Sequence, residues 1–182
     1  MIRSLLLVLS LVTSSLFGSE LTLEAINKKY AAKKDFTAQL IYEKRSPYLL
    51  RPISHNITLT VKGASFIWWD HQSGQKIEID AKGQIKGDLF PSKGQKDRNA
   101  TMLVQQLREL VHADFTALQK RYHLTIKGDS LTGIAKNKKS KLFDQVNFTF
   151  DKQIDIRSIQ FKMGDELSTI TFKSFKNREQ SK

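Results

Sequence analysis

The chain has 182 residues, no cysteine and a formal net charge of +12 at pH 7. Without cysteine it can form no disulfide, no thiolate metal site and no lipid-modified cysteine. A hydrophobic fraction of 40% with 11 Phe allows one domain with a sizeable core. The basic balance fits either contact with an anionic surface, such as lipid headgroups, or simple solubility.

The first residues have the composition of a cleavable secretory signal. Arg3 gives a positive start, an apolar run ends at Phe17, and the small Gly18 follows. The run is shorter than the about 20 apolar residues that a membrane-spanning helix needs, which disfavours the alternative of an uncleaved anchor. We therefore expect residues 1–19 to be a signal peptide and residues 20–182 to be one exported, soluble domain.

The spacing of apolar residues predicts helices and strands along the rest of the chain. In the first half it predicts a helix at 21–34, strands at 36–42 and 57–61 around a Pro-containing loop at 44–52, and strands at 66–69, 77–79 and from 85. A loop at 88–99 follows, and then helices from 101 and at 114–121. The last third is predicted to form strands at 122–126, 131–135, 146–150, 159–163 and 170–172. Asp114 is the expected N-cap of the last helix. Turn signals between the strands, without a β-α-β rhythm, favour an antiparallel sheet.

The apolar residues leave two interpretations of the sheet open. If helices cap one concave face, the inward side chains line a cavity suited to an acyl chain, since each buried CH₂ contributes about 0.8 kcal/mol. Alternatively, the same side chains pack against the helices as an ordinary core. Trp68 and Trp69 are neighbours in a strand, so one should face the core and the other outward.

Basic and histidine residues give little sign of chemistry. The lysines of a hairpin at 136–141 either form a solvated tip or meet an anionic membrane surface. Asp70-His71 is a suggestive pair, but its place at a turn favours surface polarity. The four histidines, His55, His71, His112 and His123, have no recognised metal-ligand spacing. We expect a non-enzyme without metal or cofactor.

The order of motifs resembles the periplasmic outer-membrane lipoprotein carrier family of the LolA type. A leading helix precedes D-F-T-A-Q-L, which is similar to the family's F-x-A-x-F-x-Q strand. Next comes I-T-L-T-V-K-G-A-S-F-I-W-W, similar to its G-x-L-x-V-x-R-P-x-x-F-x-W. Gly63-Ala64 stands where the family has Arg-Pro, whose arginine helps hold the lid closed. The closing F-x-P-x-G segment is also missing, so the chain looks like a divergent member.

The resemblance implies an α+β fold: a curved, unclosed antiparallel half-barrel with a helical lid over its apolar concave face. It also implies a periplasmic monomer that takes acyl chains of a lipoprotein or lipid from inner-membrane release machinery to an outer-membrane receptor. No nucleic acid partner is expected. An alternative is a non-enzymatic interaction or sensor domain of the same fold that binds an anionic partner through its basic surface. The expected lipid-binding residues are Met102, Leu103, Leu107 and Leu110 on the lid face, and Phe36, Leu40, Leu59, Val61, Ile67, Trp69, Phe148, Phe161 and Phe172 on the cavity wall.

Overall fold

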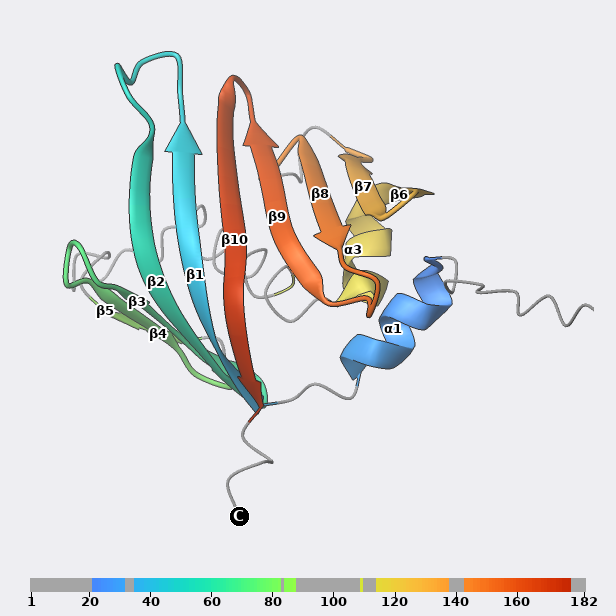
Figure 1. Cartoon of the computed structure of the whole chain (residues 1–182), viewed down its shortest axis with the longest axis horizontal. Helices are drawn as coiled ribbons and strands as arrows, with labels where there is room; N and C mark the ends of the chain where they lie inside the picture. The colour runs from blue at the N-terminus through green and yellow to red at the C-terminus, as the bar shows by residue number, and fades with distance from the viewer. Residues whose placement is uncertain are drawn as a thin grey trace, which may run out of the picture.

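A curved, ten-stranded antiparallel sheet organises the chain, with two helices against one of its faces (Figure 1). The computed structural model describes residues 21–31, 35–82, 84–87, 109, 114–137 and 143–177. The elements are α1 Leu23–Ala31, β1 Asp35–Arg45, β2 Ile53–Lys62, β3 Ser65–Asp70, β4 Lys76–Ile79, β5 Ile85–Gly87, α3 Phe115–Arg121, β6 Tyr122–Lys127, β7 Ser130–Ala135, β8 Gln145–Phe150, β9 Ile156–Met163 and β10 Glu166–Asn177.

The strand order is β5-β4-β3-β2-β1-β10-β9-β8-β7-β6. Two meanders, β1 to β5 and β6 to β10, therefore join where the first strand pairs with the last. The sheet does not close on itself, because β5 and β6 remain as its two edges. The predicted fold class, an unclosed half-barrel of antiparallel strands with helices, is confirmed.

Alternation gives the sheet an apolar inner face and a polar outer face. On β2 the inner side chains Ile57, Leu59 and Val61 are buried, and the intervening Thr58 and Thr60 are partly exposed. The same pattern holds on β8 and β9, whose inner residues belong to one continuous core. Successive strand residues point to opposite faces, so this period of two fixes which face carries the core.

The two described helices lie on the inner face beside β8. The Asp114 side chain accepts a hydrogen bond from Ala117 N at 2.9 Å and starts α3, as the sequence predicts. Phe115 then packs edge-on against Phe148, with ring centroids 5.0 Å apart, and Tyr30 of α1 packs on Phe115 at 6.1 Å. The helix predicted from residue 101 lies outside the described residues, apart from Glu109. No helix in the described part of the chain is long and apolar enough to cross a membrane.

Gly133 on β7 makes the closest packing in this half of the sheet. A Cβ at this position would lie 2.8 Å from Val146 Cγ2 and 2.9 Å from Leu124 Cδ2, nearer than real Cβ atoms approach. Both neighbours are on adjacent strands of the inner face, so neither can move without disturbing the core.

Gly133→Ala is therefore expected to lower the free energy of unfolding by about 1–3 kcal/mol through overpacking. Ile134→Ala is the matched control, because Ile134 is the next residue of the same strand and is 58% exposed on the outer face. The control should change stability by less than about 0.5 kcal/mol. Urea denaturation of both variants measures the difference, and equal stability would contradict the packing at Gly133.

Candidate functional site

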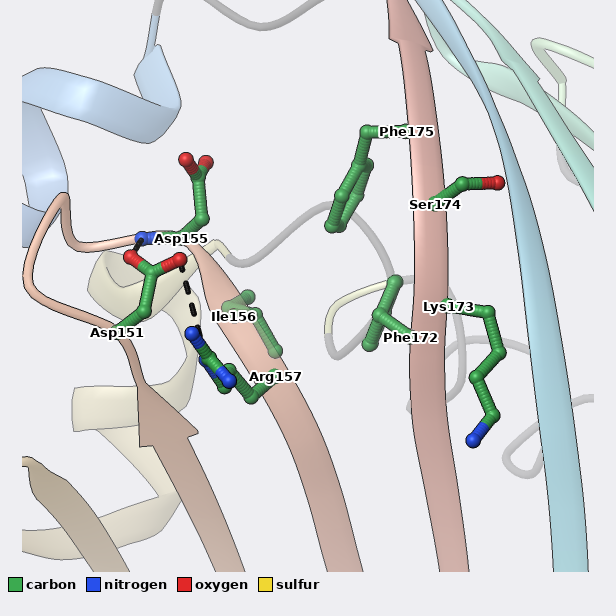
Figure 2. A pocket seen from close by; sticks show the side chains of 8 residues that line it. All are labelled: Asp151, Asp155, Ile156, Arg157, Phe172, Lys173, Ser174 and Phe175. Atoms are coloured by element: carbon green, nitrogen blue, oxygen red, sulfur yellow. Dashed lines mark hydrogen bonds and ion pairs between the residues drawn. The ribbon is translucent and has the colours of Figure 1, made fainter.

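The sheet opens between β9 and β10 at one end. The two strands pair from Glu166 opposite Met163 to Thr171 opposite Ser158. Beyond that point β10 continues along β1, whereas β9 turns toward β8. The divergence leaves a pocket of about 440 Å³ between them (Figure 2).

Two segments line this pocket. The last part of β10 supplies four residues, and the β8–β9 turn with the start of β9 supplies the others. Figure 2 shows the two phenylalanine rings on the side of β10 that faces the turn, with the charged groups of the turn opposite. The lining residues are Asp151, Asp155, Ile156, Arg157, Phe172, Lys173, Ser174 and Phe175.

The apolar wall of the pocket is a stack of aromatic rings. The rings of Phe172 and Phe175 are 4.9 Å apart and nearly parallel, at 9°. Phe175 also contacts the buried Phe36 of β1 at 5.7 Å. Half-buried rings at the pocket thus continue directly into the core of the inner face.

A bulge in β10 makes this stack possible. Gln39 pairs with Ser174 and Leu40 with Phe172, which leaves Lys173 as an extra residue in the ladder. Strict alternation would place Phe172 and Phe175 on opposite faces. The extra residue shifts the register by one, so both rings reach the inner side.

The opposite wall is a strained turn held by one carboxylate. Asp151 Oδ1 accepts hydrogen bonds from the backbone N–H groups of Gln153 and Asp155, both at 2.9 Å. Ile154 between them has a φ of 62°, a region that costs a β-branched residue about 1–3 kcal/mol. Asp151 also lies 3.9 Å from the Arg157 guanidinium. The turn keeps its strained shape because the hydrogen bonds of Asp151 and the contacts around it stabilise this conformation.

Helix α1 supplies the most buried of these contacts. The Tyr30 hydroxyl accepts from Ile156 N at 2.7 Å and donates to Ile154 O at 3.2 Å. Burial raises the pKa of Tyr30 far above its usual range, and the negative charges of Asp155 and Asp151 add to this, against the lowering effect of the Ile156 hydrogen bond. The phenol therefore stays protonated and can both donate and accept.

A second tether joins α1 to the same turn at the surface. Lys29 Nζ lies 2.9 Å from Asp155 Oδ1 and also donates to Gln153 O. This ion pair is partly exposed, so it contributes at most about 1 kcal/mol. Together with Tyr30 it fixes α1 beside the turn that forms one wall of the pocket.

A separate polar cluster lies at the other end of the inner face. Asp70 is buried and binds His55 Nδ1 at 2.5 Å, the Ser73 hydroxyl at 2.7 Å and the backbone N–H of Gln72 at 2.9 Å. Desolvation raises the Asp70 pKa, but the combined hydrogen bonds from Ser73, Gln72 and His55 outweigh it and lower the pKa. The Ser73 hydroxyl binds the carboxylate and not His55, so the three residues lack the order nucleophile–base–carboxylate of a catalytic triad.

This cluster corrects the interpretation of Asp70-His71 as surface polarity. Asp70 is a buried residue whose imidazole partner is His55, fifteen positions away in the sequence. His71 points to the outer face, where its ring packs at a tilt against Trp69, with centroids 4.5 Å apart, and forms a hydrogen bond with Thr58 at 2.7 Å. Among the described residues, no group of three His, Asp or Glu side chains could hold a metal ion.

The expected lipid-binding residues divide into four sets. Phe172 lines the pocket, while Ile67 and Trp69 lie on the outer face. The four residues of the expected lid face lie outside the described part of the chain. The remainder are buried in the core of the inner face: Phe36, Leu40, Leu59, Val61, Phe148 and Phe161.

The assignment of Ile67 and Trp69 to the cavity wall is wrong in this structure. Val61 pairs with Phe66 and Leu59 with Trp68, so Phe66 and Trp68 share the inner face. Trp69 is 47% exposed on the other side. The motif resemblance favoured the second tryptophan, whereas the two-residue turn at 63–64 sets a register that turns the first one inward.

Most of the pocket residues were missed by sequence reasoning. Phe175 could have been found, because its spacing from Phe172 breaks the alternation of the strand and signals a bulge. Ile156 and Arg157 begin a strand that was predicted to start at Ile159. Nothing in the sequence indicates that the 151–155 turn faces the end of β10.

Comparison with known proteins gives matches among solved structures. No family model and no curated protein sequence matches the chain. A LolA superfamily protein from Nitrosomonas europaea is 13% identical, with a TM-score of 0.43 over 87% of this chain and 94% of that one. The lipoprotein LppX from Mycobacterium tuberculosis is 12% identical, with a TM-score of 0.45 over 85% and 92%. A putative outer membrane lipoprotein-sorting protein domain from Vibrio parahaemolyticus is 8% identical, with a TM-score of 0.38 over 86% and 92%.

Tyr30→Phe tests the tether between α1 and the pocket. The variant leaves the buried Ile156 N–H without its acceptor, so the free energy of unfolding at pH 7 should fall by about 1–3 kcal/mol. Tyr48→Phe is the control, because Tyr48 is 85% exposed. If both variants unfold at the same urea concentration, the Tyr30 hydrogen bonds do not stabilise the turn.

The raised pKa of Tyr30 also predicts a pH dependence. The folded protein holds the phenolic proton more tightly than the unfolded chain, so the stability from this group is full below pH about 10 and is lost as pH rises above it. Tyr30→Phe should reduce the alkaline slope by up to about 1.4 kcal/mol per pH unit. Urea melts between pH 8 and 11 measure the slope, and an unchanged slope would show that Tyr30 is not buried as described.

Proposed function

We propose that the protein binds the acyl chain of a lipid or lipoprotein and carries it through the periplasm toward the outer membrane. The observation that carries this proposal is the pocket between β9 and β10, whose aromatic wall runs into the apolar inner face. Most side chains of the inner face are already buried in this structure. The pocket is therefore the place where a chain first finds apolar surface.

The size and lining of the pocket suit one end of an amphiphile. A volume of about 440 Å³ falls within the range of about 300–1,000 Å³ typical of small-molecule sites. Phe172, Phe175 and Ile156 offer apolar contact, and each buried CH₂ of a ligand contributes about 0.8 kcal/mol. A chain that extended past Phe175 would reach Phe36 and the core of the inner face.

The charged rim suits the polar end of the same ligand. Asp151 and Arg157 lie against each other at the pocket, and Lys173 stands exposed on β10. The rim of the pocket therefore carries both a hydrogen-bond acceptor, the Asp151 carboxylate, and cationic donors, Arg157 and Lys173. A ligand with an ester or an anionic group beside its chain could replace water there without leaving a charge unpaired.

A carrier must also release what it binds. The polar contacts of α1 with the 151–156 turn include a partly exposed ion pair and a hydrogen bond of Lys29, and the hydrogen bonds of Tyr30. The strained φ of Ile154 opposes these contacts. A ligand or partner that binds the opened turn more tightly than the closed one would shift the equilibrium toward release.

The direction of transport and the partners follow from the expected signal peptide and the motif order. Both favour a soluble periplasmic shuttle without enzymatic activity, loaded by inner-membrane release machinery and unloaded at an outer-membrane receptor. The net charge of +12 would help the protein approach the anionic surfaces of the envelope.

Native mass spectrometry of protein purified from the periplasm, followed by organic extraction, tests the proposal. A lipid at defined stoichiometry is expected. Phe175→Glu should weaken uptake of an added fluorescent fatty acid about tenfold or more, because a carboxylate would stand in the aromatic wall. Trp69→Glu is the matched control, since it makes the same change on the outer face and should bind normally.

Circular dichroism and thermal melting must show that the Phe175→Glu protein is folded. A clean apo mass without uptake of added acyl chains would overturn the proposal. It would favour the alternative of an interaction domain that binds an anionic partner through its basic surface. Equal loss of binding in both variants would place the acyl site away from the pocket.

A further inference from the structure

The hairpin between β1 and β2 ends in a tip of exposed apolar side chains, residues 46–53. Tyr48 is 85% exposed and Leu50 is 106% exposed, the two highest values among the large apolar residues of the described chain. Ile53, at the start of β2, is 39% exposed. In Figure 1 this loop projects past the end of the sheet.

The neighbouring β9–β10 turn extends the apolar surface. Met163, the last residue of β9 before the β9–β10 turn, is 45% exposed. It lies at the same end of the sheet as the β1–β2 tip, because Glu166 at the start of β10 pairs with Met163 and the next residue, Leu167, pairs with Arg45 at the end of β1. Four of the six exposed large apolar side chains of the described residues therefore gather here. The other two, Trp69 and Ile134, lie on the outer face, on β3 and β7.

The sequence of the tip keeps these side chains outward at little entropic cost. Pro47 and Pro52 restrict the backbone on either side of Tyr48 and Leu50. Two hydrogen bonds to Ser46, from Tyr48 N at 3.3 Å and Leu49 N at 3.0 Å, close the turn. The backbone that carries Tyr48 and Leu50 is thus restrained by local structure, and their exposure follows from the shape of the turn.

Basic residues frame the apolar tip. Arg45 is 66% exposed and pairs with Glu43 at 2.7 Å, and Lys44 pairs with Glu166 at 2.8 Å. Arg51 is exposed and has no ion-pair partner among the described residues. Its charge is therefore available to an anionic surface directly beside Leu50.

We infer that the β1–β2 tip docks on an anionic lipid bilayer, with Leu50 and Tyr48 inserted at the interface and Arg51 on the headgroups. Tyrosine at headgroup level, an aliphatic side chain below it and a flanking arginine are the arrangement that an interface favours. A protein partner fits less well, because a convex turn with three apolar side chains is far smaller than the about 800 Å² per partner of a stable interface.

This inference does not depend on the pocket. The tip lies where β1 ends and β2 begins, whereas the pocket lies at the opposite end of β10, near Asn177. Docking by the tip would leave the pocket residues out of contact with the bilayer surface. Vesicle binding and fatty-acid binding are therefore separate readouts.

Sedimentation with vesicles of phosphatidylcholine and phosphatidylglycerol in a 3:1 ratio tests the inference. At low salt the purified protein should bind these vesicles and bind pure phosphatidylcholine more weakly. Leu50→Ser should lower the partition coefficient about tenfold or more, and Arg51→Gln about fivefold at low salt but little at 0.5 M salt. Ile134→Ser, at an exposed position on β7, is the matched control and should bind like the parent protein.

Leu50→Trp gives a second measurement on a variant that keeps an apolar tip. This variant carries three tryptophans, so the change is read as the difference from the parent spectrum. A blue shift on adding the mixed vesicles is expected, because the new indole should leave water.

Absence of vesicle binding by the parent protein would overturn the inference. So would binding that Leu50→Ser leaves unchanged, since the contact would then lie on another basic surface. Loss of fatty-acid uptake in Phe175→Glu with normal vesicle binding would leave it intact.

Discussion

The antiparallel pairing of β1 with β10 is the contact on which the rest of the structure depends. It joins the first and last strands of the domain and turns two separate meanders into one sheet. At one end it brings α1, which precedes β1, next to the 151–156 turn. At the other end it sets Arg45 opposite Leu167, so the β1–β2 and β9–β10 turns lie at the same end of the sheet. Such long-range pairing is entropically costly to form and is repaid by the core that it creates.

The pocket lies where the sheet departs from regularity. The bulge at Lys173 turns Phe175 toward Phe172, and the left-handed Ile154 shapes the turn across from them. Between them β9 leaves β10, and the pocket opens at that divergence. A regular ladder would place Phe172 and Phe175 on opposite faces of the sheet, and the two rings could not form one wall. Strain and irregularity are stable here because Asp151 and Tyr30 satisfy the backbone groups that the turn exposes.

The domain separates its contacts along β1 and β10. Apolar and charged groups meet at the pocket near the end of β10, a buried polar cluster around Asp70 lies on β3, and an apolar tip stands where β1 turns into β2. Among the described residues, the outer face between them is largely Thr, Ser, Asn and Gln, with few apolar side chains. A protein built this way can hold a ligand at one end and touch a surface with the other. This arrangement agrees with the proposed shuttle, which needs both contacts at separate places.

The sequence by itself determined the order of the strands along the chain, the antiparallel class, the cap at Asp114 and the apolar faces of β2 and β8, because these follow from local period, turn residues and capping chemistry. The two-residue turn of the β2–β3 hairpin was also present in the sequence. Its register turns Trp68 inward, whereas the motif resemblance had favoured Trp69. The tertiary structure alone decided that β1 meets β10, that β9 leaves it, and that the partner of Asp70 is His55. These contacts join residues far apart in the chain. No local pattern encodes them, because they result from packing two meanders around one core.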